Sequence, residues 1–379
     1  MRPLILHVGM SKTGTTSLQT TLFNSPPVKE FRFISLDTDF GNQLFEFVFR
    51  DSSDDPSRIF RQRITPQRRP SLGEYYRNYL DTTLRACANA QSTPVLSAEI
   101  IWSFTRRELT CIRDFFQSRG FSIQVIGYIR SPLEHIESAY QQLVKAGRTG
   151  HLPFVLERIS TLPDRVAALD EVFGRENVRL FVFAPNTFPG RCVVRHFCNV
   201  AGIDCRHLKV HRENESINLH VLKFVYAWNS LHKDDIFSLK STVTRRILLD
   251  ALRTLDGPRL MFHSSLTGAA IDQISAYLPA LQQRLGQALP LSLATRDPLD
   301  GIRSEEEFLT FSSESLFWLA RQFFPALRAN GHNSGSLETV VRRLDLLCRL
   351  RTPDRFTVNL VKFAGIRFRR VRMVRRMKA

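Results

Sequence analysis

Cysteine is scarce in this chain of 379 residues, and its spacing excludes several classes of protein. The six cysteines contain no C-x-x-C pair and form no dense framework, so the sequence predicts neither disulfides nor a zinc site. We expect reduced and mostly buried thiols instead. They occupy positions 87, 111, 192, 198, 205 and 348.

Long hydrophobic runs are also missing. No run reaches the roughly 18 apolar residues that a membrane-spanning helix requires. The first apolar strand is expected to begin at Leu4, which leaves no room for a signal peptide, so the sequence predicts a cytoplasmic protein. Hydrophobic residues nevertheless make up 43% of the chain, enough for one sizeable core with a helical extension.

Acidic residues are too few to balance the basic ones, since 36 Asp and Glu face 53 Lys and Arg, for a net charge of +17. Between Lys362 and Lys378 there are eight basic residues, several apolar ones and no acid. Such a tail can lie on the inner face of an anionic membrane, bind a polyanion or remain solvated. The sequence has none of the motifs of the common nucleic-acid-binding modules, so no nucleic acid partner is predicted.

Apolar strands alternate with helical stretches up to about residue 200, which is typical of an α/β fold with a mostly parallel central sheet flanked by helices. Strands are expected near residues 4–8, 31–36, 94–98, 122–129 and 178–183. The polar stretch 51–71 predicts a loop that borders an acceptor cleft. Three regions follow from this pattern: an α/β core over 1–211, a helical extension over 212–335 and a basic tail over 336–379.

The helical extension shows no clear strand. Its spacing of apolar residues predicts helices at 217–231, 241–254, 268–287 and 305–323. These helices are candidates for shaping an acceptor site, but their sequence does not identify the acceptor or the oligomeric state.

The first strand opens into a glycine loop that favours an anion. The loop reads Gly9-Met10-Ser11-Lys12-Thr13-Gly14-Thr15-Thr16 and is followed by Ser17 and a helix. Its glycines have the spacing of the phosphate-binding template G-x-x-x-x-G-K-[ST], but the lysine is at position 12 instead of position 15. Four hydroxyls and the amides of a helix N-terminus favour a bound phosphate. The alternative is an ordinary strand-to-helix turn with a Ser or Thr cap.

A second anion-binding segment follows the strand 122–129. The chain continues as Arg130-Ser131-Pro132, and a helix is expected from Leu133 to Val144 with Ser138 on it. Open α/β sheets bind ligands at the carboxyl ends of their strands, where Arg130 would lie. A guanidinium and a hydroxyl there can hold a second phosphate, although Arg130 alone could be a surface charge.

Together, these segments resemble those of sulfotransferases that use 3′-phosphoadenosine 5′-phosphosulfate (PAPS), and most closely the bacterial carbohydrate sulfotransferase-like branch. The resemblance covers about the first 200 residues and implies a P-loop-type fold. By that resemblance, Ser11 and Lys12 to Ser17 hold the 5′-phosphosulfate, Arg130 and Ser138 hold the 3′-phosphate, and the acceptor is a glycan or glycolipid. The motifs that carry it are Ser11-Lys12-Thr13-Gly14-Thr15-Thr16 and Tyr128-Ile129-Arg130-Ser131-Pro132 with Ser138 and Tyr140.

Sulfuryl transfer gives chemical roles to two further features. Negative charge grows on the leaving oxygen, and Lys12 is the candidate cation that stabilises it. The acceptor must lose a proton, and Glu99, directly after the strand 94–98, is the candidate base. Alternatively, Glu99 is an acidic first-turn residue of the following helix. His135 is a weaker candidate that we expect to face solvent, and His7 is expected either in the core or directly behind the site residues.

Other functions predict different features. A kinase with a degenerate loop would need a carboxylate at a strand end to hold Mg²⁺, and no apolar run closes on Asp, so no metal is expected. A polyanion- or membrane-binding protein that keeps the loop only as structure is the non-enzymatic alternative. The segment Lys209–Ser216 resembles a late basic loop over the nucleotide, but a solvated turn before the next helix explains it as well.

Overall fold

In the computed structural model, the described residues are 1–25, 30–35, 41–50, 69–150, 152, 161–206, 208–211, 216–232, 238–289, 301–323 and 336–351. They belong to two compact units. The first unit comprises Met1–His135, Ile159–Glu215 and Asp272–Ala294, and the second comprises the remaining segments. The border between the units falls inside two helices, α6 (Pro132–Lys145) and α12 (Ser264–Leu285).

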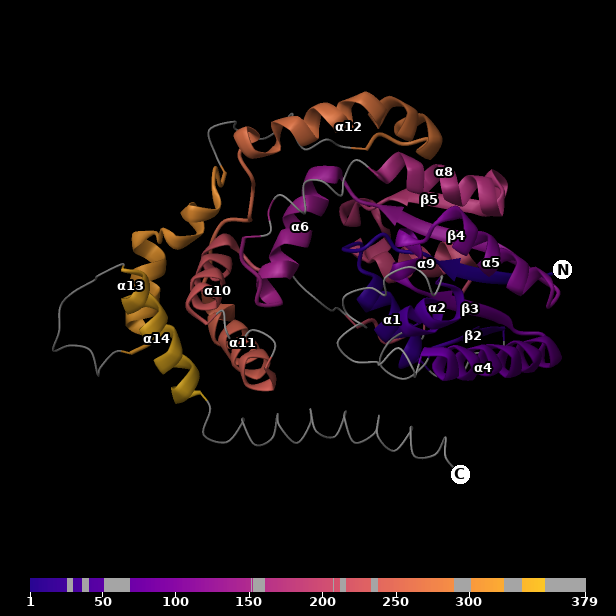
Figure 1. The fold of residues 1–379 in the computed structure, drawn as a ribbon, viewed down its shortest axis with the longest axis horizontal. Helices are drawn as coiled ribbons and strands as arrows, with labels where there is room; N and C mark the ends of the chain where they lie inside the picture. Colours follow the sequence, from indigo (N-terminus) through magenta and orange to yellow (C-terminus); the bar gives the residue numbers. More distant parts are fainter. Residues whose placement is uncertain are drawn as a thin grey trace. The chain divides into compact units, whose positions relative to one another are not determined.

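The first unit is built on a sheet of five parallel strands, which confirms the predicted α/β class (Figure 1). Every neighbouring pair is parallel, and Ile5 lies opposite both Val95 and Gln124. The order is β2-β3-β1-β4-β5. The strands are β1 (Arg2–His7), β2 (Phe31–Phe33), β3 (Thr93–Ser97), β4 (Phe121–Ile129) and β5 (Val178–Val182).

Helices cover both faces of this sheet, which is why its strands read as almost continuous apolar runs. Side chains alternate along β1, so Ile5 packs with α1 and α9 while Leu4 and Leu6 belong to the core on the other face. The first face is covered by α1 (Thr15–Phe23) and α9 (Val193–Ala201). The second face is covered by α2 (Asn42–Phe49), α4 (Arg69–Ala90), α5 (Arg106–Gln117) and α8 (Leu162–Phe173).

The second unit is helical in its described part. Four of its helices are α10 (Leu219–Leu231), α11 (Leu239–Ala251), α13 (Ser313–Arg321) and α14 (Leu337–Leu350). Each begins at a capping side chain that accepts a bond from a first-turn amide, namely Asn218, Ser238, Ser312 and Ser336. The caps place the starts of α10 and α11 within two residues of the predicted positions, whereas α13 starts eight residues later than predicted and α14 was not predicted.

Two local predictions need correction. The stretch 305–323 is a 3₁₀ helix, η10 (Glu305–Leu309), followed by a separate helix α13, because the Ser312 side chain caps a new start. The expected loop at 51–71 is helical at its end, where Arg69–Ser71 begin α4 with a proline in the first turn. Residues 51–68 and the basic segment Lys362–Lys378 lie outside the described residues. In the part that is described, no helix is long and apolar enough to cross a membrane.

Candidate functional site

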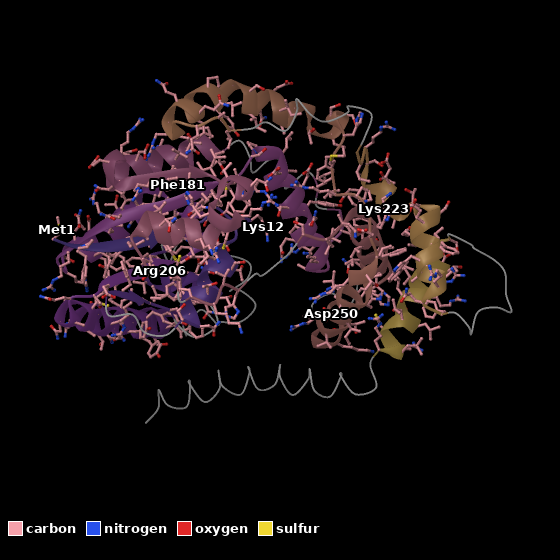
Figure 2. All side chains as sticks on the ribbon, turned by 180° about the vertical axis from the view of Figure 1, so that it is seen from behind. Met1, Lys12, Phe181, Arg206, Lys223 and Asp250 are labelled. Atoms are coloured by element: carbon pink, nitrogen blue, oxygen red, sulfur yellow. The ribbon has the colours of Figure 1, made fainter. Side chains whose placement is uncertain are left out.

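The strand order places one end of β1 at the point where ligands bind in open α/β sheets. Strand β1 lies between β3 and β4. The chain continues from β1 to β2 on one side of the sheet and from β4 to β5 on the other, so β1 marks a topological switch point. The glycine loop follows β1, Glu99 follows β3 and Arg130 follows β4. In Figure 2, Lys12 lies at the end of the sheet opposite Met1. Three candidate segments far apart in the sequence therefore meet at one edge.

The glycine loop has the backbone of an anion-binding turn. Gly9, Lys12 and Gly14 have positive φ angles of 92°, 67° and 78°, a conformation that side chains such as that of Lys12 rarely adopt. The loop is tied to β4, because Met10 N donates to Tyr128 O at 3.0 Å and Tyr128 N donates to Gly9 O at 2.7 Å. These two bonds hold the loop against the end of β4.

The hydroxyls of the loop divide into two groups. Thr13 Oγ1 donates to Met10 O at 2.6 Å, and Thr15 Oγ1 lies 3.5 Å from the same oxygen. Both threonines are buried, so their hydroxyls stabilise the turn and their backbone amides are what they offer to an anion. Thr16 and Ser17 are partly exposed in the first turn of α1, where the sequence analysis places a phosphate.

The N-terminus of α1 is open to a ligand. Its capping residue is Gly14, which has no side chain, and neither a side-chain cap nor an acidic residue occupies the first turn. Helix α9 closes the space on the other side of this glycine, since a Cβ atom at Gly14 would lie 2.7 Å from Val193 Cγ1. The first-turn amides therefore lack the side-chain acceptor that usually satisfies them, which suits an anion such as a phosphate.

Arg130 is held against the glycine loop. Its Nη1 donates to Lys12 O at 3.1 Å, and its Nε donates to Glu134 Oε2 at 3.2 Å. Its side chain is only 11% exposed and lies over the Phe183 ring, 5.8 Å from the centroid. The structure thus brings the two predicted phosphate-binding segments into contact. Glu134, four residues after Arg130 in the sequence, is a partner that the i,i+4 spacing could have indicated.

Lys12, Glu99 and Arg130 form one electrostatic group. Burial raises the pKa of the Glu99 carboxyl, and the Lys12 ammonium partly offsets that rise. Burial also lowers the pKa of Lys12, with Glu99 acting against this change and Arg130 adding to it. The raised pKa of Glu99 and the lowered pKa of Lys12 both favour the neutral form of the side chain. Each charge is therefore costly here unless a charged partner or ligand accompanies it. Such a group matches the pattern of perturbed pKa values found at functional sites.

Glu99 is the first residue of a short 3₁₀ helix, η2 (Glu99–Ser103), and it lies beside the glycine loop. A Cβ atom at Gly9 would be 3.5 Å from Glu99 Cα, so the two backbones are in close contact. The Glu99 side chain remains partly exposed. Glu99 is thus a first-turn residue of η2 and also a carboxylate at the end of a strand, so the first-turn position is compatible with a role as base.

A buried polar network supports this edge of the sheet from below. His7 Nδ1 and Ser97 Oγ are hydrogen bonded at 2.8 Å, and Gln19 Nε2 donates to Ser97 O at 3.1 Å and to Ser97 Oγ at 3.0 Å. All three residues are buried, and burial lowers the pKa of His7 to about 3. The network links β1, α1 and β3. His7 is in the core, one of the two places expected for it, whereas its partners come from distant segments of the chain that carry no local signal.

The remaining predictions concern Ser138, His135 and the segment Lys209–Ser216. Ser138 lies on α6 in the second unit, so its approach to the 3′-phosphate stays a prediction. His135 is half-buried rather than turned fully to solvent. Lys209 is exposed, and His211 N donates to Thr21 Oγ1 at 3.0 Å, which sets this segment beside α1. Residues 212–215 lie outside the described part.

No group of three or more His, Cys, Asp or Glu side chains that could hold a metal ion occurs among the described residues. Four of the six thiols are buried, as expected, and they are Cys87, Cys192, Cys198 and Cys348.

Comparison with known proteins gives one match. No protein-family model matches the chain, and no curated protein matches it. Among solved structures, it is similar to a sulfotransferase from Alicyclobacillus acidocaldarius, with 17% sequence identity. The alignment covers 62% of this chain and 96% of that chain, with a TM-score of 0.39. At this level of similarity, the functional assignment depends on the geometry of the site.

Proposed function

We propose that this chain is a sulfotransferase that transfers a sulfuryl group from PAPS to a hydroxyl or amino group of a carbohydrate or glycolipid. The observation that carries the proposal is the bond from Arg130 to the carbonyl oxygen of Lys12, which joins two separate candidate phosphate sites. A donor with phosphates at both its 5′ and 3′ positions needs two such sites. The lysine inside the loop, instead of after it, fits a donor without a triphosphate.

The first-turn amides of α1, with Thr16 and Ser17, bind the 5′-phosphosulfate. Arg130 binds the 3′-phosphate, and Ser138 is assigned to the same phosphate by resemblance alone. A negatively charged donor also favours the charged form of Lys12, whose pKa is lowered by burial and by the neighbouring Arg130.

The transfer step is a displacement at sulfur. The acceptor oxygen or nitrogen forms a bond to sulfur, the bond from sulfur to the bridging oxygen breaks, and its electron pair leaves with 3′-phosphoadenosine 5′-phosphate (PAP). Glu99 takes the proton of the acceptor, and its raised pKa makes it a stronger base than an ordinary carboxylate. Lys12 stabilises the charge that grows on the bridging oxygen, which lowers the barrier more than it strengthens donor binding.

Equilibrium dialysis with labelled PAP tests this donor class. The proposal expects binding in the presence of EDTA that excess PAPS displaces and that excess ATP with Mg²⁺ does not. Displacement by ATP with Mg²⁺, together with transfer of the γ-phosphate, would support a kinase instead. Absence of PAP binding would contradict the proposal and favour a loop that is kept only as structure. From the sequence we also propose that the basic tail contacts a membrane and that the protein is cytoplasmic.

A further inference from the structure

Trp102 follows Glu99 by three residues on the same short 3₁₀ helix, η2. Side chains at i and i+3 of a 3₁₀ helix lie on the same side, about 6 Å apart along the axis. Trp102 packs part of its ring against the core of the first unit and leaves part of it exposed. An aromatic surface therefore accompanies the carboxylate that the proposed function uses as its base.

The polar edge of this indole is available to a ligand. Within the described residues, Trp102 Nε1 has no hydrogen-bond partner. Trp228, by contrast, donates from its Nε1 to Asp345 Oδ1 at 2.8 Å. A tryptophan usually finds a partner for its N–H group when the ring is fully buried, and an open N–H beside a half-exposed ring suits a ligand that is apolar on one side and polar at its edge.

The position of η2 is fixed from the side of α2. Asn42 Oδ1 accepts a bond from Ile100 N at 3.2 Å, and Arg50 Nη2 donates to Ser103 Oγ at 2.7 Å. Arg50 also lies over the Phe104 ring, 4.7 Å from its centroid. This short helix is thereby attached at two places, to Asn42 at the start of α2 and to Arg50 directly after its end.

The arginine of this attachment belongs to a buried ion pair. Arg50 Nε lies 2.8 Å from Glu46 Oε2, and the two side chains are 12% and 0% exposed. A buried ion pair adds little net stability, because the cost of removing both charges from water offsets their attraction. Its effect here is geometric: it aims Arg50 at Ser103 and so holds η2 in one orientation, with Glu99 and Trp102 presented together.

We infer that Trp102 is the acceptor platform of the proposed sulfotransferase and that the acceptor is a pyranose. The apolar face of the sugar ring stacks on the indole, one hydroxyl bonds to Nε1, and another is presented to Glu99. Sites for small molecules combine aromatic walls with a few fixed polar groups, and η2 supplies both from adjacent turns. This inference rests on the proposed function, since it assigns the acceptor side of the same site.

The test uses sulfur-35-labelled PAPS with the full chain and a panel of methyl pyranosides and amino sugars, beside phenol and an aliphatic alcohol. Trp102→Ala is expected to raise the KM for the sugar acceptor by about 10-fold or more, because a stacked ring contributes on that scale. Trp102→Phe keeps the aromatic face and is expected to stay within about 3-fold of wild type. The matched control is Trp318→Ala, which removes another half-exposed tryptophan from α13.

Calorimetric binding of PAP distinguishes a failure of the Trp102 platform from a failure of the proposed function. Each variant should bind PAP within about 2-fold of wild type, which also shows that it is folded. If wild type binds PAP but Trp102→Ala leaves the acceptor KM unchanged, the platform is wrong and the proposed function stands. Sulfation of the phenol or alcohol but of no sugar also overturns the platform. If wild type does not bind PAP, the proposed function itself fails.

Discussion

The guanidinium of Arg130 donates a hydrogen bond to the carbonyl oxygen of Lys12, although the two residues are 118 positions apart in the chain. The same guanidinium also donates to Glu134, which lies one helical turn further along. The Glu134 carboxylate thus accepts a hydrogen bond from the side chain that is expected to bind a phosphate. A phosphate must compete with Glu134 for it.

Glu134→Gln is therefore expected to strengthen PAP binding, by roughly 3- to 10-fold, because it removes both a competitor and a negative charge near the phosphate. Calorimetry at low and moderate salt measures the effect. The control is Glu171→Gln, which removes a carboxylate from the exposed ion pair with Arg106. Weaker PAP binding in Glu134→Gln would show that Glu134 positions Arg130 and does not compete with the ligand.

Glu99→Gln is expected to abolish transfer while preserving the donor site. Loss of a general base lowers kcat by about 100- to 10,000-fold, whereas PAP affinity should change little. A single-turnover assay with PAPS and a sugar acceptor separates the two. Turnover that remains at the wild-type level would remove Glu99 from the chemistry.

The same substitution is expected to stabilise the fold at neutral pH. The folded-state pKa of Glu99 is raised above its ordinary value of 4.5, so its contribution to stability is present below that pH and is lost as the pH rises through the folded pKa. Glu99→Gln should therefore increase the melting temperature by about 1–3 °C at pH 7.5 and not at pH 4. Equal changes at both pH values would mean that Glu99 carries no buried charge.

Ser97→Ala should destabilise the first unit, by about 1–3 kcal/mol, because it leaves buried polar atoms of His7 and Gln19 without the hydroxyl they bond. Urea unfolding gives the change in free energy. Ser122→Ala is the control, since that hydroxyl bonds to Arg2 O in an exposed position at the start of the sheet. A neutral result for Ser97→Ala would indicate that the pocket adapts around the missing oxygen.

His7 should make the fold sensitive to acid. Its folded-state pKa is about 3 against an ordinary value of 6.5, so stability is complete above pH 6.5 and falls as the pH drops toward 3. His7→Asn places an amide in the ring position and removes the titration. Its unfolding free energy should fall less steeply between pH 6.5 and 3 than that of wild type. Parallel pH curves would assign the acid sensitivity to carboxylates instead.

The sheet was predictable because parallel strands buried on both faces must be apolar along their whole length. The two candidate phosphate segments were predictable because each is local, a glycine loop and an arginine directly after a strand. The supports of the site were not. Gln19 and Ser97 are 78 positions apart, and Arg50 and Ser103 are 53 apart, so only the folded chain shows that they meet.

Local sequence also could not decide the direction of the loop hydroxyls. Four hydroxyls near a helix start predict phosphate contacts, but two of them, on Thr13 and Thr15, turn back toward Met10 O. The break between η10 and α13 was missed for a similar reason. The apolar spacing continues through it, and the Ser312 cap that starts the second helix gives only a weak signal in the sequence.

The most direct test of the account is calorimetric binding of PAP, without metal, to wild type, Arg130→Ala and Arg106→Ala. Arg106 serves as the control because its side chain is 53% exposed and is paired with Glu171. We expect binding to wild type and no change in Arg106→Ala. Arg130→Ala should lose about 30- to 100-fold in affinity, because charge-assisted bonds to a phosphate are lost. Equal PAP affinity in all three proteins would contradict a two-phosphate site that includes Arg130.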